Sequence, residues 1–391
     1  MSYDCPNCGA SGLDVFYEAG EIPVHSCIML NRREDALAFP RRALTLGACP
    51  QCAFISNILF DSSVQAYTAG YEEQQSFSPR FRTFQTEMIG DLIRTYDLHH
   101  KDVIEIGCGK GDFLVELCET GKNRGIGIDP TSDPERLEGP GGERVRFLKE
   151  LYGPQHADLP ADFVCCRHTL EHIPATHEFV GMIREVIGDR RDVVVFFEVP
   201  AVERVLEEEA FWDVYYEHCS YFSLGSLAHV FRRNRFDIIE LRKDFDEQYL
   251  LIVVRPVSSV RKTERANEDD ISKIADGVAT FREGVRRTID GWRDRLTALK
   301  RQDRCVAVWG SGSKCVSFLS AMGPELKIDA IVDINSFRHG KWLAGIGRQV
   351  EAPESLVGYA PDLVVVMNPI YLDEIQRHLD SMGISAEVTA V

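Results

Sequence analysis

The chain has 391 residues, of which 44% are hydrophobic and 27% are charged, a composition typical of a globular protein of two or three domains. It contains no apolar run of membrane-spanning length, and its first residues do not resemble a signal peptide, so we expect a cytoplasmic protein. The formal net charge of -17 argues against binding to nucleic acid, which requires Lys and Arg to neutralise phosphates.

Two C-x2-C pairs near the N-terminus predict a metal site. Their members are Cys5, Cys8, Cys49 and Cys52. This spacing lets two thiolates from one turn reach the same tetrahedral Zn²⁺, and four thiolates leave no open position, so we expect a structural zinc. One alternative is that the four cysteines bind no metal. Another is that His25 or Cys27, which lie outside the pairs, replaces one of the four as a ligand. A zinc-ribbon protein that binds nucleic acid is a competing class, which the acidic charge disfavours.

A strand, a glycine-rich turn and a helix follow one another from residue 103. The apolar run 103–106 predicts a buried strand, and a helix is expected to begin at Asp112. Glycines in the turn between them allow the backbone to approach a ligand closely. The next strand, 125–128, ends at Asp129, where a carboxylate can accept hydrogen bonds from the ribose hydroxyls of an adenosine.

These motifs resemble the class I S-adenosylmethionine (SAM)-dependent methyltransferases. The acidic-x-G-x-G-x-G motif of that family is matched by Glu105, Gly107, Gly109 and Gly111. The block 162–174, which contains Arg167 and His168, matches the family's fourth strand and the helix entry after it. The resemblance implies that SAM is bound by these residues together with Asp129, and that 249–254 forms the last, antiparallel strand. A nicotinamide-binding domain is the alternative.

The segment 211–223 brings aromatic rings, a carboxylate and an imidazole together. It contains Tyr215, Glu217 and His218, and it ends at Ser223, which is expected to cap a helix. Histidine is well suited to take a proton near neutral pH, and an adjacent carboxylate can orient it. The alternative is that Glu217 and His218 are structural polar groups. For His172, the alternative is that it only shapes the cofactor pocket.

The C-terminal third predicts a long helix and a second α/β unit. An apolar stripe predicts one amphipathic helix over 260–299. Strands are expected over 305–309, 328–332 and 363–367. The turn after the first of these strands could cradle a phosphate with its N–H, hydroxyl and ammonium groups. The turn consists of Gly310, Ser311, Gly312, Ser313 and Lys314. The alternative is a duplicated domain that holds no ligand.

Taken in order, these parts resemble the sugar C-methyltransferases of the deoxysugar type. The resemblance implies a zinc-binding lobe over 1–65, a class I methyltransferase domain over 66–257, and a connecting helix with a second Rossmann-like α/β domain over 258–391. The family's catalytic Tyr-x-Glu-His matches Tyr215, Glu217 and His218.

The resemblance also implies the roles of individual residues. In the family the histidine matching His218 removes the C3 proton of a nucleotide-linked 4-keto-6-deoxysugar, and His172 lies near the keto group. Tyr71 matches a substrate-side tyrosine, for which Tyr67 is the alternative. The nucleotide sugar is expected to contact the turn 310–314 as well. The sequence departs from the family at 108–111 and 246–249, which leaves an O- or N-methyltransferase of another small molecule as the alternative function.

Overall fold

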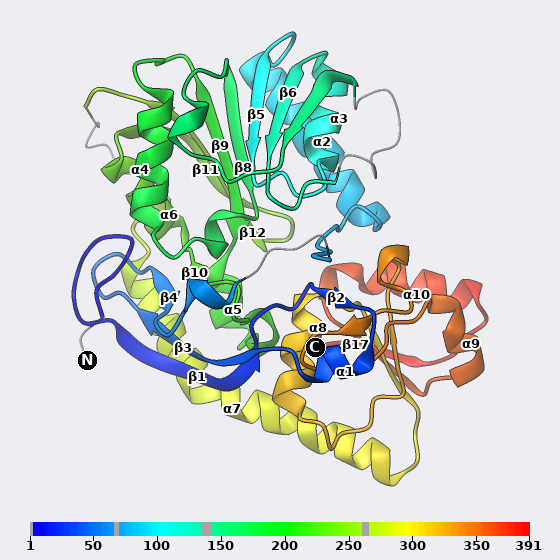
Figure 1. Cartoon of the computed structure of the whole chain (residues 1–391). Coiled ribbons are helices and arrows are strands. Elements are labelled where there is room, and N and C mark those ends of the chain that lie inside the picture. The colour runs from blue at the N-terminus through cyan, green and yellow to red at the C-terminus, as the bar shows by residue number, and fades with distance from the viewer. Residues whose placement is uncertain (1–2, 66–69, 134–142, 260–265) are drawn as a thin grey trace.

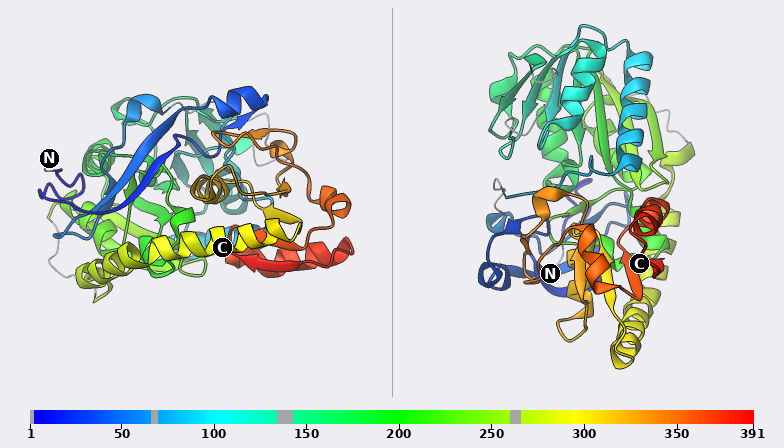
Figure 2. Two further views of the ribbon diagram at one scale, coloured as in Figure 1. Left: turned by 90° about the horizontal axis from the view of Figure 1, so that it is seen from below. Right: turned by 90° about the vertical axis from the view of Figure 1, so that its right-hand side faces the viewer.

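The computed structural model describes residues 3–65, 70–133, 143–259 and 266–391, so the predicted alternative Tyr67 lies outside the described residues. A domain built on a large sheet occupies the upper half of the molecule in Figure 1. The N-terminal lobe and the C-terminal α/β domain lie side by side beneath it, and a long helix runs under both (Figures 1 and 2).

The upper domain contains a seven-stranded sheet in the order β11-β12-β9-β8-β5-β6-β7. The pairs among β5 to β9 are parallel, whereas β12 is antiparallel to both of its neighbours, as predicted for the last strand. The strands are β5 Asp102–Ile106, β6 Arg124–Ile128, β7 Val145–Leu148, β8 Phe163–Arg167, β9 Val194–Pro200, β11 Phe236–Asp244 and β12 Tyr249–Pro256. This is the class I methyltransferase sheet that the motifs indicated.

Helices cover both faces of this sheet (Figure 1). They are α2 Pro79–Tyr96, α3 Asp112–Gly121, α4 Thr176–Ile187 and α6 Leu224–Arg233, with the short 3₁₀ helix η5 at Leu170–His172. Helix α5 (Val202–Glu207) instead lies below the sheet in Figure 1. The predicted cap at Ser223 is confirmed, because its hydroxyl accepts a hydrogen bond from the Ser226 N–H at the start of α6.

The N-terminal lobe is tied to both other parts through its strands. Its strands are β1 Asp14–Pro23, β2 Met29–Leu30, β3 Arg41–Ala48 and β4 Ile55–Asn57, and α1 spans Arg33–Leu37. The sheet of β1, β3 and β4 is completed by β10 (Ser220–Tyr221), which directly follows the predicted catalytic segment. Strand β2 pairs with β15 (Trp342–Leu343) of the C-terminal domain.

The C-terminal domain contains a parallel four-stranded sheet in the order β14-β13-β16-β17. Its elements are β13 Val306–Trp309, β14 Ala330–Val332, β16 Leu363–Val366, β17 Glu387–Ala390, α8 Ser313–Met322, α9 Leu356–Tyr359 and α10 Leu372–Ser381. The predicted second α/β unit is therefore present, and each predicted strand lies within two residues of an observed one.

The long helix α7 spans Ile271–Arg301 and begins later than predicted. The Asp270 carboxylate, just before its first turn, accepts a hydrogen bond from the Gly225 N–H at 2.7 Å, which fastens the chain to α6 before the helix begins. Residues 260–265 lie outside the described part of the chain. The predicted stripe is buried at Ile274, Val278, Phe281, Val285 and Leu296, but Ile271 is 41% exposed.

One hydrophobic core joins all three parts of the chain. It includes Phe16 of the lobe, Phe211 of the middle segment, Phe281 of α7 and Val308 of the C-terminal domain. The division at 65 and 257 stays a prediction, and these shared contacts indicate that the parts hold one another in place. No helix in the described ranges is long and apolar enough to span a membrane.

Candidate active site

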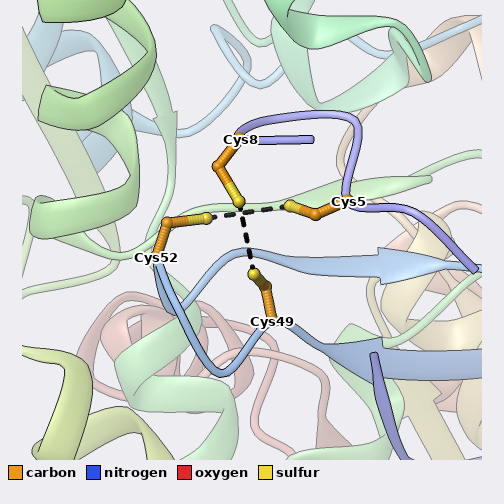
Figure 3. A group of neighbouring side chains, drawn as sticks. All are labelled: Cys5, Cys8, Cys49 and Cys52. Carbon is orange, nitrogen blue, oxygen red and sulfur yellow. Dashed lines mark hydrogen bonds between the residues drawn. The ribbon is translucent and has the colours of Figure 1, made fainter. Parts of the chain in front are cut away.

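The four predicted cysteine ligands converge at one point beside α6 (Figure 3). The sulfurs of Cys5 and Cys52 are 3.7 Å apart, and those of Cys8 and Cys49 are 3.5 Å apart. A tetrahedron of sulfurs about 2.3 Å from Zn²⁺ has edges of about 3.8 Å. The observed separations fit that shell, so the four thiols form a candidate metal site.

The surroundings of the cysteines fix this site to the methyltransferase domain. The Asn7 amide lies 3.7 Å from the Cys52 sulfur and donates a hydrogen bond to the Ser226 carbonyl of α6 at 3.0 Å. Arg233 donates a hydrogen bond to the Asn7 carbonyl at 2.6 Å. Such outer contacts orient metal ligands. His25 and Cys27 take no part in the cluster.

The glycine turn after β5 has the backbone geometry that only glycine adopts easily. Gly107, Gly109 and Gly111 have φ values of +68°, +53° and +90°. A Cβ atom on Gly109 would lie 2.5 Å from a carboxylate oxygen of Glu73. The Gly109 N–H donates a hydrogen bond to the Asp129 carboxylate at 3.0 Å, so the predicted acidic residue at the end of β6 lies directly at the turn.

Two carboxyl groups at this turn have a buried oxygen without a hydrogen-bond partner among the described residues. They are Glu105, which is 2% exposed, and Glu73. Burial raises the pKa of Glu105 to about 8 and that of Glu73 to about 7. Buried groups of this kind are stabilised by a cation, so the turn fits a positively charged ligand such as SAM.

Arg167 and His168 form a charged network with Glu198 at the ends of β8 and β9. The Arg167 Nε atom donates to Glu198 at 2.6 Å, and its guanidinium stacks 4.2 Å from the Phe113 ring. Burial opposes a charge on His168, but Glu198 outweighs it and raises the pKa of His168 to about 9. Both side chains therefore contact Glu198 of the protein itself. Direct contact of Arg167 and His168 with the cofactor stays a prediction.

The histidine predicted to act as the base is buried among aromatic rings. His218 is 8% exposed, and its ring centroid lies 4.2 Å from that of Tyr215 and 4.8 Å from that of His172. Burial lowers the pKa of His218 well below its ordinary value, and the neighbouring imidazoles of His172 and His168 act in the same direction. The imidazole is therefore neutral near pH 7, the state in which it can accept a proton.

The adjacent carboxylate does not orient His218. Glu217 instead accepts hydrogen bonds from the His25 Nδ1 at 3.0 Å and from the Ser26 N–H at 3.1 Å. Burial opposes ionisation of Glu217, but the His25 hydrogen bond prevails and lowers its pKa. We infer that Glu217 ties the lobe to the predicted catalytic segment and thereby positions His218 indirectly.

Tyr71 lies near this pair, on the chain segment that leaves the lobe. Its ring centroid is 6.0 Å from that of His25, and it packs with Cys27 and Ile28. The Cys27 sulfur is 3.2 Å from the Ser313 hydroxyl of the C-terminal turn. Tyr71 therefore lies where the lobe meets the C-terminal domain, close to the predicted catalytic segment.

The donors of the C-terminal turn are used inside the protein. The N–H and hydroxyl of Ser311 both donate to the Asp333 carboxylate, at 2.7 and 2.6 Å. The Lys314 ammonium contacts Asp213, and the Ser313 hydroxyl donates to Glu217 at 3.4 Å. Gly310 has a φ of +99°. The contacts of Lys314 and Ser313 connect the turn to the segment that carries His218.

The first turn and the histidine cluster are linked by one short stretch of chain. The Thr169 hydroxyl lies 3.4 Å from the Gly107 carbonyl, and the Thr169 carbonyl accepts the His172 N–H at 3.0 Å. The Glu171 carbonyl accepts the Cys219 N–H at 3.0 Å. The cofactor turn, His172 and His218 therefore share one end of the sheet, where ligands bind in open α/β folds.

Three residues of this region were not identified from the sequence as site residues. Glu73 follows the lobe in a segment without a recognisable motif, and His25 was weighed only as a metal ligand. Glu171 was part of the matched block, next to His172, but received no role. Its acidic side chain between two histidines was a usable signal.

The comparisons with known proteins agree with this geometry. Residues 81–241 match the family model of a methyltransferase domain. The sheet, the glycine turn and this match define a class I SAM-dependent methyltransferase. Residues 253–386 match the C-methyltransferase C-terminal domain, which accounts for the second α/β unit. Together the two matches indicate a SAM-dependent methyltransferase whose C-terminal part is similar to the C-terminal domain of C-methyltransferases.

A curated relative supports the same assignment. The C-methyltransferase NovU of Streptomyces niveus is 27% identical over 290 residues, which cover 70% of this chain and 67% of the relative. Among solved structures, a putative SAM-dependent methyltransferase of Listeria monocytogenes is 15% identical, with coverage of 45% of this chain and 100% of that one, and a TM-score of 0.34. Magnesium protoporphyrin IX methyltransferase of Synechocystis, with S-adenosylhomocysteine bound, is 15% identical over 48% of this chain and 91% of that one, with a TM-score of 0.35. TM-scores this low carry no argument about function.

Proposed function

We propose that this methyltransferase transfers the methyl group of SAM to C3 of a nucleotide-linked 4-keto-6-deoxysugar or a closely similar keto-activated small molecule. The match of the C-terminal domain to C-methyltransferases supports transfer to carbon. The single observation that carries the mechanism is the neutral, buried imidazole of His218, which lies beside His172 and Tyr215.

In this proposal the cofactor is held at the turn after β5. Glu105, Glu73 and Asp129 supply negative charge for its amino-acid and adenosine parts, and the glycines 107, 109 and 111 allow a close approach of the backbone. SAM supplies an electrophilic methyl group on a sulfonium. The four cysteines form a separate group of ligands that would hold a structural Zn²⁺.

The chain's own contribution is to make carbon nucleophilic. A 4-keto group acidifies the hydrogen on C3, because the resulting carbanion is delocalised as an enolate. His218 is neutral at pH 7 and accepts that proton. His172 or Tyr215, whose rings lie beside that of His218, donates a hydrogen bond to the developing enolate oxygen, which stabilises the transition state more than the ground state.

Hydrogen exchange tests the proton-transfer step without methyl transfer. The protein is incubated in deuterated water with S-adenosylhomocysteine and a nucleotide-linked 4-keto-6-deoxysugar, and the C3 hydrogen is followed by NMR. We expect exchange in the wild type and a loss of about 100- to 10,000-fold in His218→Asn, the usual contribution of a general base. His99→Asn is the matched control, because His99 is exposed at the far end of α2.

The outcomes separate the alternatives. Equal exchange in His218→Asn and the wild type would remove His218 as the base. Methyl transfer to oxygen or nitrogen, without C3 exchange, would favour the O- or N-methyltransferase. Contact of the nucleotide with residues 310–314 stays a prediction, and a raised KM for the nucleotide sugar in Ser313→Ala, with kcat unchanged, would support it.

A further inference from the structure

A second group of potential metal ligands lies at the histidine cluster. One ligand atom from each of Glu171, His172 and His218 lies within 4.8 Å of the other two. The first two residues belong to η5, and the third belongs to the segment before β10. Two imidazoles and one carboxylate are a ligand set typical of divalent transition metals.

The carboxylate of this group is unusual for a buried charge. Glu171 is 1% exposed, and neither of its oxygens accepts a hydrogen bond from a described residue. Its nearest charged neighbour is the His168 Nδ1, 3.5 Å from Oε1. His168 supplies one nearby cation for this buried carboxylate, and the carboxylate oxygens keep lone pairs with which to bind a metal ion.

The backbone holds the two sides of the group together. The Cys219 N–H donates to the Glu171 carbonyl at 3.0 Å, and the Ser220 hydroxyl donates to the Ile173 carbonyl at 2.8 Å. The rings of His172 and His218 are perpendicular. Nitrogen and oxygen ligands of one Zn²⁺ are about 3.4 Å apart, so the three side chains, whose ligand atoms lie within 4.8 Å of one another, must move closer together to hold an ion.

We propose that Glu171, His172 and His218 form a second metal site, which binds a divalent transition ion of the Co²⁺ or Zn²⁺ class. The site is separate from the four cysteines and has three protein ligands, so it leaves a position open toward the substrate.

The consequence for catalysis rests on the proposed function. A nitrogen lone pair that binds a metal cannot also accept the C3 proton. An ion bound here therefore inhibits the enzyme by occupying His218, and it competes with the substrate for the same space. The four-cysteine site has no such effect, because its ligands do not include His218.

Titration with Co²⁺ tests the site directly. The starting material is full-length protein that holds one zinc per chain by elemental analysis, so that the cysteine site is filled. We expect one further Co²⁺ per chain by calorimetry, with an absorption spectrum that lacks thiolate charge-transfer bands. Glu171→Gln and His172→Ala are expected to weaken Co²⁺ binding by at least about tenfold, whereas His99→Ala binds like the wild type.

Absence of Co²⁺ binding beyond the zinc, or unchanged affinity in both Glu171→Gln and His172→Ala, would overturn the proposal. Thermal unfolding of each variant shows whether a loss of binding reflects a loss of the fold, and two ligand variants make the test independent of either one. The proposed function fails separately: a protein that binds the second Co²⁺ but exchanges no C3 hydrogen retains the metal site and loses the sugar mechanism.

Discussion

The two glycine-rich turns of this molecule have similar local structure and different surroundings. Each follows a buried parallel strand and leads into a helix, after β5 in one case and after β13 in the other. At the first turn, Glu105 and Glu73 each have a buried oxygen without a hydrogen-bond partner among the described residues. At the second turn, the Ser311 hydroxyl and the Lys314 ammonium contact Asp333 and Asp213 of the protein itself.

This difference shows that a strand–turn–helix motif does not by itself define a ligand site. The first turn presents carboxyl groups with unpaired buried oxygens, and a cationic cofactor would stabilise their ionised forms. The second turn has its cation and hydroxyl groups already paired, so its main effect is to fix the segment that carries His218. Fold similarity between the two domains therefore does not imply that both bind a nucleotide.

The largest expected effect concerns the candidate zinc site of the N-terminal lobe. Cys49→Ser removes one thiolate of the candidate zinc site, and metal binding of this kind contributes directly to folding. We expect less than one zinc per chain by elemental analysis and a melting temperature lower by about 10 °C. Zinc content and a melting temperature that are both unchanged in Cys49→Ser would show that Cys49 does not bind a structural metal.

A matched pair of glycine variants compares the two turns themselves. In Gly109→Ala, the new Cβ lies 2.5 Å from the Glu73 carboxylate, at a φ of +53°. We expect SAM affinity to fall by about tenfold or more, since the turn must move. In Gly310→Ala, the nearest side-chain atom, on Met367, is 3.6 Å away, so only the φ of +99° is unfavourable. Gly310→Ala should lose about 1–3 kcal/mol of stability and keep its SAM affinity. Equal SAM affinity in Gly109→Ala and Gly310→Ala would contradict the proposed difference between the two turns.

Lys314 tests whether the second turn is structural. Lys314→Met leaves the half-buried Asp213 with Arg204 as its remaining cation, which should lower the free energy of unfolding by about 2 kcal/mol. Denaturant unfolding measures this loss, and Lys341→Met, at an exposed hydrogen bond to Asn31, is the control. A loss confined to the KM of the nucleotide sugar, with stability unchanged, would instead assign Lys314 to the substrate.

The smallest expected effect is the pH dependence of SAM binding, which tests the carboxyl groups at the first turn. Burial raises the pKa of Glu105 to about 8 and that of Glu73 to about 7, so both carboxyl groups are largely protonated at pH 6. A cation favours their ionised forms, so binding releases protons and SAM affinity rises from pH 6 to 8. The rise is at most about tenfold per pH unit for each proton released.

Calorimetry in buffers of different ionisation enthalpy measures the protons released on SAM binding. The same shifts make the fold less stable in the absence of the cofactor as the pH rises from about 4 toward 8, because the unfolded chain ionises these carboxyl groups first. Affinity that stays constant from pH 6 to 8 would show that neither carboxyl group contacts the cofactor.

Local patterns in the sequence predicted much of the fold. The strand before Gly107, the cap at Ser223 and the strands of the C-terminal domain depend on neighbouring residues, and each was placed close to its observed position. The predicted start of α7 was wrong, because apolar spacing does not show that Asp270 binds the Gly225 N–H of α6 before the helix begins. The same limit applies to β10, whose partner β4 lies far away in the sequence.

The candidate site was predicted less completely, for a physical reason. The motif placed Glu217 next to His218, but adjacent residues on an irregular segment can point in different directions. The partner of Glu217 is His25, 192 positions away, and no local pattern identifies such a pair. Glu73 acquires its position at Gly109 only through tertiary packing.

The central claim is that the methyl group is transferred to carbon after His218 removes a proton. Incubation with SAM carrying a ¹³C-labelled methyl group and a nucleotide-linked 4-keto-6-deoxysugar tests it directly, with the product followed by carbon-detected NMR. The account predicts that the ¹³C-labelled methyl group is attached to C3 and that C3 has lost its hydrogen. A labelled methyl on oxygen or nitrogen, with the C3 hydrogen retained, would contradict it.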